Sequence, residues 1–135
     1  MSHLIAPSLL SANFSNLKKD IEMVNESEAD WFHLDIMDGH FVPNISFGIP
    51  VVESIKRYSK KSLDVHLMIK NPENYIEKFI EVGANIITIH VEACKEKTSY
   101  ILKKIKERNI KAGLAINPNT DYKVIEDYIN LIDMV

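Results

Sequence analysis

Disulfide chemistry is the first feature that the sequence lacks. Cys94 is the single cysteine among 135 residues, so it has no partner for a bridge within the chain. The start, MSHL, has neither the basic segment nor the long apolar run of a secretory signal. Both features favour a reducing compartment, and we expect a cytoplasmic protein.

Long hydrophobic runs and an excess of one charge are also missing. The apolar stretch at 85–91 is interrupted well short of the roughly 18 to 20 residues that cross a bilayer. Sixteen Lys and Arg stand against 19 Asp and Glu, for a formal net charge of -3. This balance gives no reason to expect a nucleic acid or a membrane as partner, and a small molecule is the better expectation.

Glycine and proline are scarce, with four and five copies, and they are scattered along the chain instead of forming a linker. The hydrophobic content of 46% is enough for a sizeable core. We therefore expect one domain over residues 1–135.

A short β-prone run followed by a longer amphipathic run recurs along the chain. The β-prone runs cover residues 4–10, 29–37, 63–69, 85–91 and 111–117, and residues 131–135 resemble the beginning of a sixth. Amphipathic runs over about 15–24, 45–58, 71–82, 97–108 and 119–129 predict the helices. This alternation predicts an α/β fold with parallel strands and helical crossovers.

The spacing of the runs favours part of a (β/α)8 barrel. Each unit takes about 27 residues, so the chain holds about five of the eight units of such a barrel. No G-x-G-x-x-G turn follows the first run, as it would in a dinucleotide-binding doubly wound sheet, and polar residues recur near the carboxyl ends of successive runs. We expect an incomplete barrel of about five βα units plus the start of a sixth strand, forming the N-terminal part of one domain.

Two histidines and an aspartate on neighbouring predicted strands form the candidate site. Residues two apart share a strand face, so His33 and Asp35 lie together on the inner face of the second run. The same parity places Asp64 and His66 on the inner face of the third. Imidazole and carboxylate ligands suit Zn, Fe, Mn or Co. The plainer interpretation is that both histidines are hydrogen-bonded core residues and Asp35 is a structural carboxylate.

Other residues on these faces carry weaker signals. Met37 and Met68 are by default core residues, with a second role as a water-excluding wall of the site. His90 and Glu92, on the inner face of the fourth predicted strand, could extend the site, although a purely structural role is the favoured interpretation. Cys94 lies in a Lys/Glu-rich stretch, and we expect no catalytic role for it.

Four segments together resemble the ribulose-phosphate 3-epimerase family. They are IAPSLLSA at 5–12, HLDIMDGHFVPN at 33–44, DVHLM at 64–68 and GLAINP at 113–118. The resemblance implies a (β/α)8 barrel isomerase that interconverts D-ribulose 5-phosphate and D-xylulose 5-phosphate in the pentose phosphate pathway. It also implies a sugar phosphate as the small-molecule partner and one divalent metal ion (Zn, Fe, Mn or Co) as the cofactor.

The resemblance assigns a role to individual residues. It implies that His33, Asp35 and His66 are metal ligands and that Asp35 is also one of two acid/base carboxylates. Ser8 and His66 become substrate contacts. Inverting a carbon beside a carbonyl requires proton removal on one face and proton return on the other, which fits two carboxylates and a cation that stabilises the negative charge.

The same resemblance gives Met37 and Met68 the role of a wall around the reacting carbon. It places the second catalytic aspartate and the phosphate-binding turns beyond Val135. We therefore expect the 135-residue chain alone to lack epimerase activity and to self-associate as a homo-oligomer.

Two alternatives stay open. Allulose-6-phosphate 3-epimerases share the metal and carboxylate motifs, and the sequence separates them only weakly from the first family. The other alternative is an inactive metal-binding fragment that self-associates. A related barrel branch that decarboxylates sugar-acid phosphates uses a D-x-K arrangement, and it fits poorly because Ile36 and Met37 follow Asp35.

Overall fold

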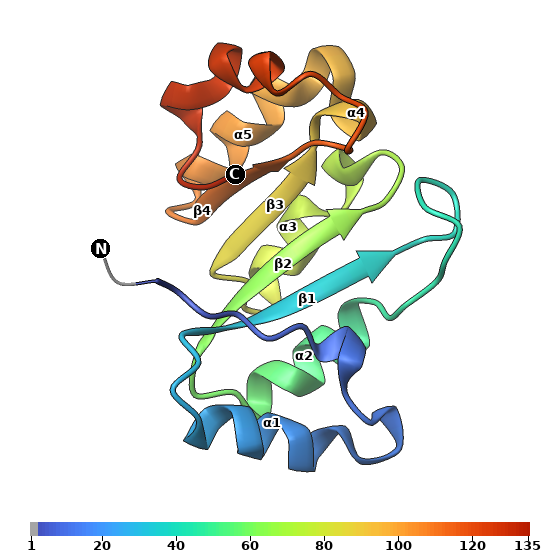
Figure 1. The fold of residues 1–135 in the computed structure, drawn as a ribbon, viewed down its shortest axis with the longest axis vertical. Coiled ribbons are helices and arrows are strands. Elements are labelled where there is room, and N and C mark those ends of the chain that lie inside the picture. Colours follow the sequence, from blue (N-terminus) through green and yellow to red (C-terminus); the bar gives the residue numbers. More distant parts are fainter. Residues whose placement is uncertain (1–2) are drawn as a thin grey trace.

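The computed structural model describes residues 3–135. Its centre is a parallel sheet of four strands (Figure 1). The strands are β1 Trp31–Met37, β2 Ser62–Met68, β3 Ile86–His90 and β4 Lys111–Ala115, in the order β1-β2-β3-β4. They confirm the predicted runs at 29–37, 63–69, 85–91 and 111–117, with ends that differ by at most two residues, and the α/β fold class.

Helices connect the strands and pack on one face of the sheet. The α-helices are α1 Leu17–Glu26, α2 Ile49–Tyr58, α3 Ile76–Glu81, α4 Val91–Cys94 and α5 Thr98–Glu107. The 3-10 segments are η1 Leu9–Ser11, η2 Phe14–Asn16, η3 Pro72–Asn74, η4 Lys95–Lys97 and η5 Tyr122–Leu131. The helix predicted at 119–129 is thus a 3-10 helix, and the helix predicted at 71–82 is divided at Tyr75. Among the described residues, no helix has both the length and the apolar character to cross a membrane.

The two faces of the sheet differ in chemistry. On β1 the burial alternates residue by residue, as a strand with one covered face requires. The helix-facing side chains are buried, namely Phe32, Leu34 and Ile36 of β1, Val65 and Leu67 of β2, and Ile87 and Ile89 of β3. The opposite face carries His33, Asp35 and His66, which are partly exposed. The polar candidate residues therefore share the face away from the helices.

The order of the strands in the sheet follows their order in the chain. A doubly wound sheet reverses this order at its switch point, whereas here each strand adds on the same side of the preceding one. The segment before β1 continues the series through a parallel bridge between Ser8 and His33, and the segment after β4 through one between Gly113 and Met134. Sequential parallel strands with helices on one face are the arrangement of a (β/α)8 barrel.

The prediction of a regular first strand at 4–10 is wrong. Ser8 alone forms a bridge to β1, and the chain then turns into η1. In this register, the next hydrogen bond of a parallel ladder toward the N-terminus would be donated by the backbone N–H of residue 7. Residue 7 is a proline, which has no N–H to donate. On the other side, the Ser8 hydroxyl accepts a hydrogen bond from the backbone N–H of Leu10 at 3.2 Å, which caps η1.

The predicted sixth strand at 131–135 is likewise reduced to one bridge. The backbone N–H of Leu114 donates to the carbonyl of Met134 at 3.1 Å, and that of Asp133 to the carbonyl of Ala112 at 2.7 Å. The Asp133 carboxylate also accepts the N–H of Ala112 at 2.8 Å, so a side chain takes the place of the next ladder bond. The described chain thus has four strands flanked by two bridging segments, in place of five strands and the start of a sixth.

Candidate metal centre and active site

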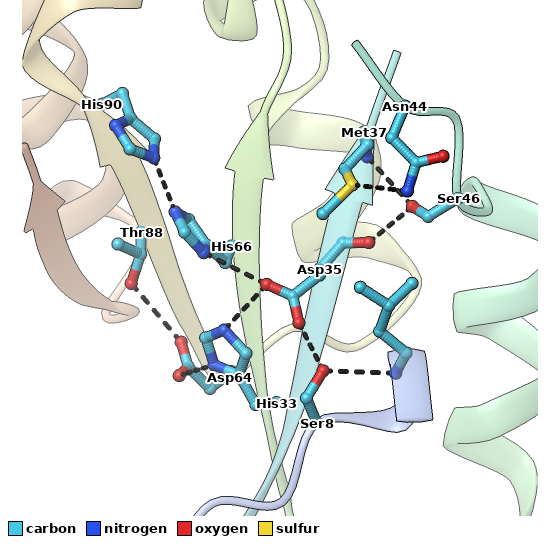
Figure 2. A network of polar contacts seen from close by, with 11 residues as sticks. Ser8, His33, Asp35, Met37, Asn44, Ser46, Asp64, His66, Thr88 and His90 are labelled. Carbon is cyan, nitrogen blue, oxygen red and sulfur yellow. Dashed lines mark hydrogen bonds and ion pairs between the residues drawn. The ribbon is translucent and has the colours of Figure 1, made fainter. Parts of the chain in front are cut away.

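The three predicted ligands converge on the inner face of β1 and β2. The strand register pairs Asp35 with His66, and His33 lies two residues before Asp35 on the same strand. Nε2 of His33 is 3.2 Å and Nδ1 of His66 is 3.3 Å from Oδ1 of Asp35. One ligand atom from each residue lies within 4.8 Å of the others (Figure 2). Two imidazole nitrogens and one carboxylate oxygen form a donor set that suits Zn, Fe, Mn or Co.

A second carboxylate holds His33 from the side away from Asp35. Oδ2 of Asp64 is 2.7 Å from Nδ1 of His33, and its Oδ1 accepts the Thr88 hydroxyl at 3.4 Å. Asp64 is only 1% exposed. Metal-binding imidazoles usually donate their second N–H to such a carboxylate, which fixes the ring tautomer. Strand parity had placed Asp64 on this face, but its contact with His33 on the neighbouring strand was not predicted.

The hydrogen bonds of the cluster determine its protonation. Bonds to Asp35 and Asp64 raise the pKa of His33 to about 10, against the effect of burial. Burial acts to raise the pKa of Asp35, but hydrogen bonds from His33, His66 and Ser8 outweigh it and hold that pKa well below its usual range. Near neutral pH the metal-free cluster is therefore a carboxylate beside an imidazolium. A metal cation would supply the positive charge that the extra proton supplies in its absence.

Two serines brace the carboxylate and its strand. The Ser8 hydroxyl donates to Oδ2 of Asp35. Ser46, which the sequence analysis did not identify, donates to the backbone carbonyl of Asp35 at 2.5 Å and accepts the backbone N–H of Met37 at 3.0 Å. Ser8 thus lies at the edge of the cluster, where it was predicted to contact substrate.

The two methionines lie side by side at the carboxyl ends of their strands. Met37 of β1 and Met68 of β2 are paired in the register, and both are partly exposed. The amide of Asn44 donates to the sulfur of Met37 at 3.5 Å (Figure 2). This placement is compatible with a wall of the site, which stays a prediction.

His66 also contacts a third histidine. Its Nε2 lies 2.9 Å from Nε2 of His90 at the end of β3. Nδ1 of His90 in turn lies 3.3 Å from Oε2 of Glu92. Burial and then the charge of His66 lower the pKa of His90, which favours a neutral ring. Glu92 is not on a strand as predicted, because β3 ends at His90 and Glu92 lies in the first turn of α4.

Cys94 borders a cavity of about 390 Å³ beside α4, which Lys70 and Glu92 also line. The thiol is buried, and this burial, followed by the charges of Glu73 and Glu92, raises the pKa of Cys94 to about 12. A protonated thiol is a poor nucleophile. The environment of Cys94 therefore gives no support for a catalytic role.

The sequence is similar to those of known proteins over nearly its whole length. The model of the ribulose-phosphate 3 epimerase family matches residues 4–135. The chain is 45% identical to a ribulose-phosphate 3-epimerase of Synechocystis sp. over 133 residues, which cover 98% of the chain and 58% of the relative. It is 45% identical to one of Bacillus subtilis over 131 residues, covering 97% and 60%. It is 38% identical over 129 residues to the cytoplasmic isoform of Oryza sativa subsp. japonica, covering 96% and 55%. The chain thus spans less than two thirds of the length of these relatives.

Proposed function

Because the chain belongs to the ribulose-phosphate 3-epimerase family, we propose that its site serves the interconversion of D-ribulose 5-phosphate and D-xylulose 5-phosphate. The family fold is a (β/α)8 barrel, and we assign residues 1–135 to the N-terminal part of one such domain. In this proposal the substrate is a sugar phosphate whose C3 is inverted, as in the pentose phosphate pathway. The protein is then an isomerase of the epimerase type.

The observation that carries the proposal is the convergence of His33, Asp35 and His66. These residues would hold one divalent metal ion, and their donor set is compatible with Zn, Fe, Mn or Co. When bound, such a cation supplies positive charge that stabilises the negative charge developing on the substrate. The buried carboxylate of Asp64 behind His33 supports this assignment, because outer partners of this kind accompany metal-binding histidines.

Asp35 is the proposed acid/base group. Inversion at C3 needs a proton acceptor on one face of the substrate and a donor on the other, so two groups take part. A group that accepts the C3 proton must be ionised, and in the metal-free protein hydrogen bonds from His33, His66 and Ser8 keep Asp35 so. In the metal-bound protein the cation would take over this role from the two imidazoles. The hydroxyl of Ser8 orients the carboxylate through Oδ2.

The remaining residues would bind the substrate and exclude water. Ser8 and His66 adjoin Asp35 and are the proposed substrate contacts. Met37 and Met68 lie together at the carboxyl ends of β1 and β2, where their sulfurs would form a polarizable apolar wall.

Exchange of the C3 proton with deuterated solvent tests this proposal. We expect the metal-loaded chain to exchange the C3 proton of D-ribulose 5-phosphate, and Asp35→Asn to reduce the rate by about 100-fold or more, because general base catalysis is lost. Asp127→Asn, at an exposed aspartate of η5, is the matched control. NMR follows the exchange, and D-allulose 6-phosphate measured in parallel tests the alternative substrate.

Exchange without net epimerisation is expected from the chain alone, because the family resemblance assigns the second acid/base aspartate to a position after Val135. An exchange rate in Asp35→Asn equal to that of the wild type would contradict the role of Asp35. Complete turnover by a monomeric 135-residue chain would contradict the need for a second carboxylate.

We also propose that the 135-residue chain by itself forms a homo-oligomer. Apolar side chains are exposed along both flanking segments of the sheet, with Leu4 59%, Ile5 57% and Val135 69% exposed. A second copy could cover these edges. The cytoplasmic location is likewise a proposal, since the relatives include a cytoplasmic isoform of Oryza sativa subsp. japonica and a chloroplastic epimerase of Arabidopsis thaliana.

A further inference from the structure

Nε2 of His66 points away from the proposed metal site and contacts another histidine, His90. Nε2 of His66 lies 2.9 Å from Nε2 of His90, while its Nδ1 lies 3.3 Å from Oδ1 of Asp35 (Figure 2). The contacts continue from Nδ1 of His90 to Oε2 of Glu92 at 3.3 Å. We propose that His90 and Glu92 are positioning residues, which hold His66 in the tautomer whose Nδ1 can bind the metal ion.

When both imidazole rings are neutral, the contacts from His66 through His90 to Glu92 allow two arrangements of protons, because a single proton lies between the two Nε2 atoms. In the first, His66 donates its Nε2–H to His90, and His90 donates its Nδ1–H to Glu92. Nδ1 of His66 then carries a lone pair for a metal ion. In the second, His90 donates to His66, whose remaining proton is on Nδ1 and blocks metal binding, and a lone pair of His90 faces Glu92.

Glu92 selects the first arrangement. A carboxylate only accepts hydrogen bonds, so the second arrangement would place two acceptors, Nδ1 of His90 and Oε2 of Glu92, 3.3 Å apart. The first arrangement also places Nδ1 of His66 3.3 Å from an acceptor, Oδ1 of Asp35, but a cation held by both atoms would remove that repulsion. The selection by Glu92 therefore acts in the metal-bound protein. The carboxylate is itself held in place, since its Oε1 accepts the backbone N–H of Asn117 at 2.7 Å and the hydroxyl of Thr120. These two bonds leave Oε2 directed at His90.

Packing keeps the rings in this alignment. The rings of His66 and His90 are nearly parallel, at 19°, with centroids 4.9 Å apart. The ring of Phe41 contacts His90 from another side, also with centroids 4.9 Å apart. His90 is only 7% exposed. Rotation of its ring away from His66 and Glu92 is therefore restricted.

His33 also has a carboxylate on the side away from the proposed metal ion, and there the contact is direct. Its Nδ1 lies 2.7 Å from the Asp64 carboxylate, and its Nε2 faces Asp35. Each proposed metal-binding imidazole thus has a carboxylate behind it, directly for His33 and through His90 for His66. Loss of such an outer partner typically costs about 10- to 100-fold in metal affinity.

This inference rests on the proposed metal site, and the experiment separates the two. Cobalt(II) is titrated into the 135-residue chain, and its absorption spectrum gives the dissociation constant for the wild type and for His33→Ala, Glu92→Gln and Glu96→Gln. Glu96 is an exposed residue of η4 and controls for the loss of one negative charge. We expect a dissociation constant about 10- to 100-fold higher in Glu92→Gln, and the wild-type value in Glu96→Gln.

Nitrogen NMR of the zinc-loaded chain reads the tautomers, which a general loss of stability would not change. We expect His66 protonated at Nε2 and His90 at Nδ1 in the wild type. Glu92→Gln should give a mixture at His90, because an amide both donates and accepts. Thr120→Val, which removes one bond to Glu92, should weaken cobalt binding less, and it provides the test if Glu92→Gln does not fold.

If Glu92→Gln and Thr120→Val both keep the cobalt affinity and the tautomers of the wild type, the positioning role of His90 and Glu92 is wrong, and the proposed metal site is unaffected. Cobalt binding that His33→Ala leaves unchanged, or no cobalt binding by the wild type, would overturn the metal site and with it the inference.

Discussion

A single oxygen atom connects the residues of the proposed metal centre. Oδ1 of Asp35 lies 3.2 Å from Nε2 of His33 and 3.3 Å from Nδ1 of His66. In the metal-free protein a proton on Nε2 of His33 takes up the lone pair that a metal ion would need. Metal binding and protonation therefore compete at this atom.

This competition predicts how metal affinity depends on pH. The pKa of His33 is raised to about 10, so at pH 7 to 9 the metal-free ring is protonated at both nitrogens. A metal ion held by Nε2 would require loss of the proton there, whereas the proton shared with Asp64 would stay. We expect release of about one proton per metal ion at pH 8 and an affinity that rises about tenfold for each pH unit between about 7 and 9.

A pH indicator in weakly buffered solution measures the released proton, and zinc titrations at several pH values measure the affinity. The rise in metal affinity should level off above a pH of about 10, the pKa of His33, because the metal-free ring is then already deprotonated. An affinity that is constant between pH 7 and 9 would contradict the protonated state of His33.

At the scale of elements, β3 and β4 approach closely at a glycine. Gly113 is paired with Thr88 in the register and also bridges to Met134. A Cβ at this position would lie 2.2 Å from the Thr88 hydroxyl oxygen and 3.1 Å from Cγ of Met134. The absence of a side chain at Gly113 therefore leaves room for Thr88 to reach Asp64 behind the metal ligand His33.

We expect Gly113→Ala to destabilise the chain by about 1–3 kcal/mol, because the new methyl group overpacks the contact with Thr88. It should also weaken metal binding, since Thr88 must rotate away from Asp64. Gly48→Ala is the matched control, because a Cβ at Gly48 meets nothing within 4 Å. Urea unfolding and zinc titration of both variants measure the two effects. Equal stability of the two variants would contradict the close contact.

At the scale of the whole molecule, the sheet has an extended segment at each edge. The segment beside β1 contacts the strand through Ser8, and its side chains Leu4 and Ile5 are 59% and 57% exposed. The segment beside β4 ends with Val135, which is 69% exposed. Edges of this kind favour pairing with another chain.

We expect the chain to self-associate in a concentration-dependent manner, and Ile5→Lys to weaken this association, because a lysine on an edge opposes pairing. Met23→Lys is the control, since Met23 on α1 is similarly exposed, at 62%. Sedimentation velocity at several concentrations measures both variants. A monomer at all concentrations, or the same effect of both substitutions, would contradict association through this edge.

The sequence by itself determined the four central strands and the faces on which the site residues lie. Alternation with a period of two is a local property of a strand, so it placed His33 and Asp35 on one face without reference to the rest of the chain. The segments at 4–10 and 131–135 were overpredicted. Strand propensity is a property of one segment, whereas a β-ladder also depends on the hydrogen bonds that the neighbouring strand can form with that segment.

Contacts across strands and loops were decided only by the tertiary structure. Strand parity predicted that His33, Asp35 and His66 share the inner face of neighbouring strands, but the register that pairs Asp35 with His66 was decided by the tertiary structure. The role of Asp64 depends on the rotamer of the His33 ring. The role of Glu92 depends on the rotamer of the His90 ring and on the end of β3 at His90. Glu92 is held by Asn117 and Thr120, which lie 25 and 28 residues further along the chain. Such contacts form only when the helices have packed the strands into one sheet, because no local pattern encodes the distance between side chains on different elements.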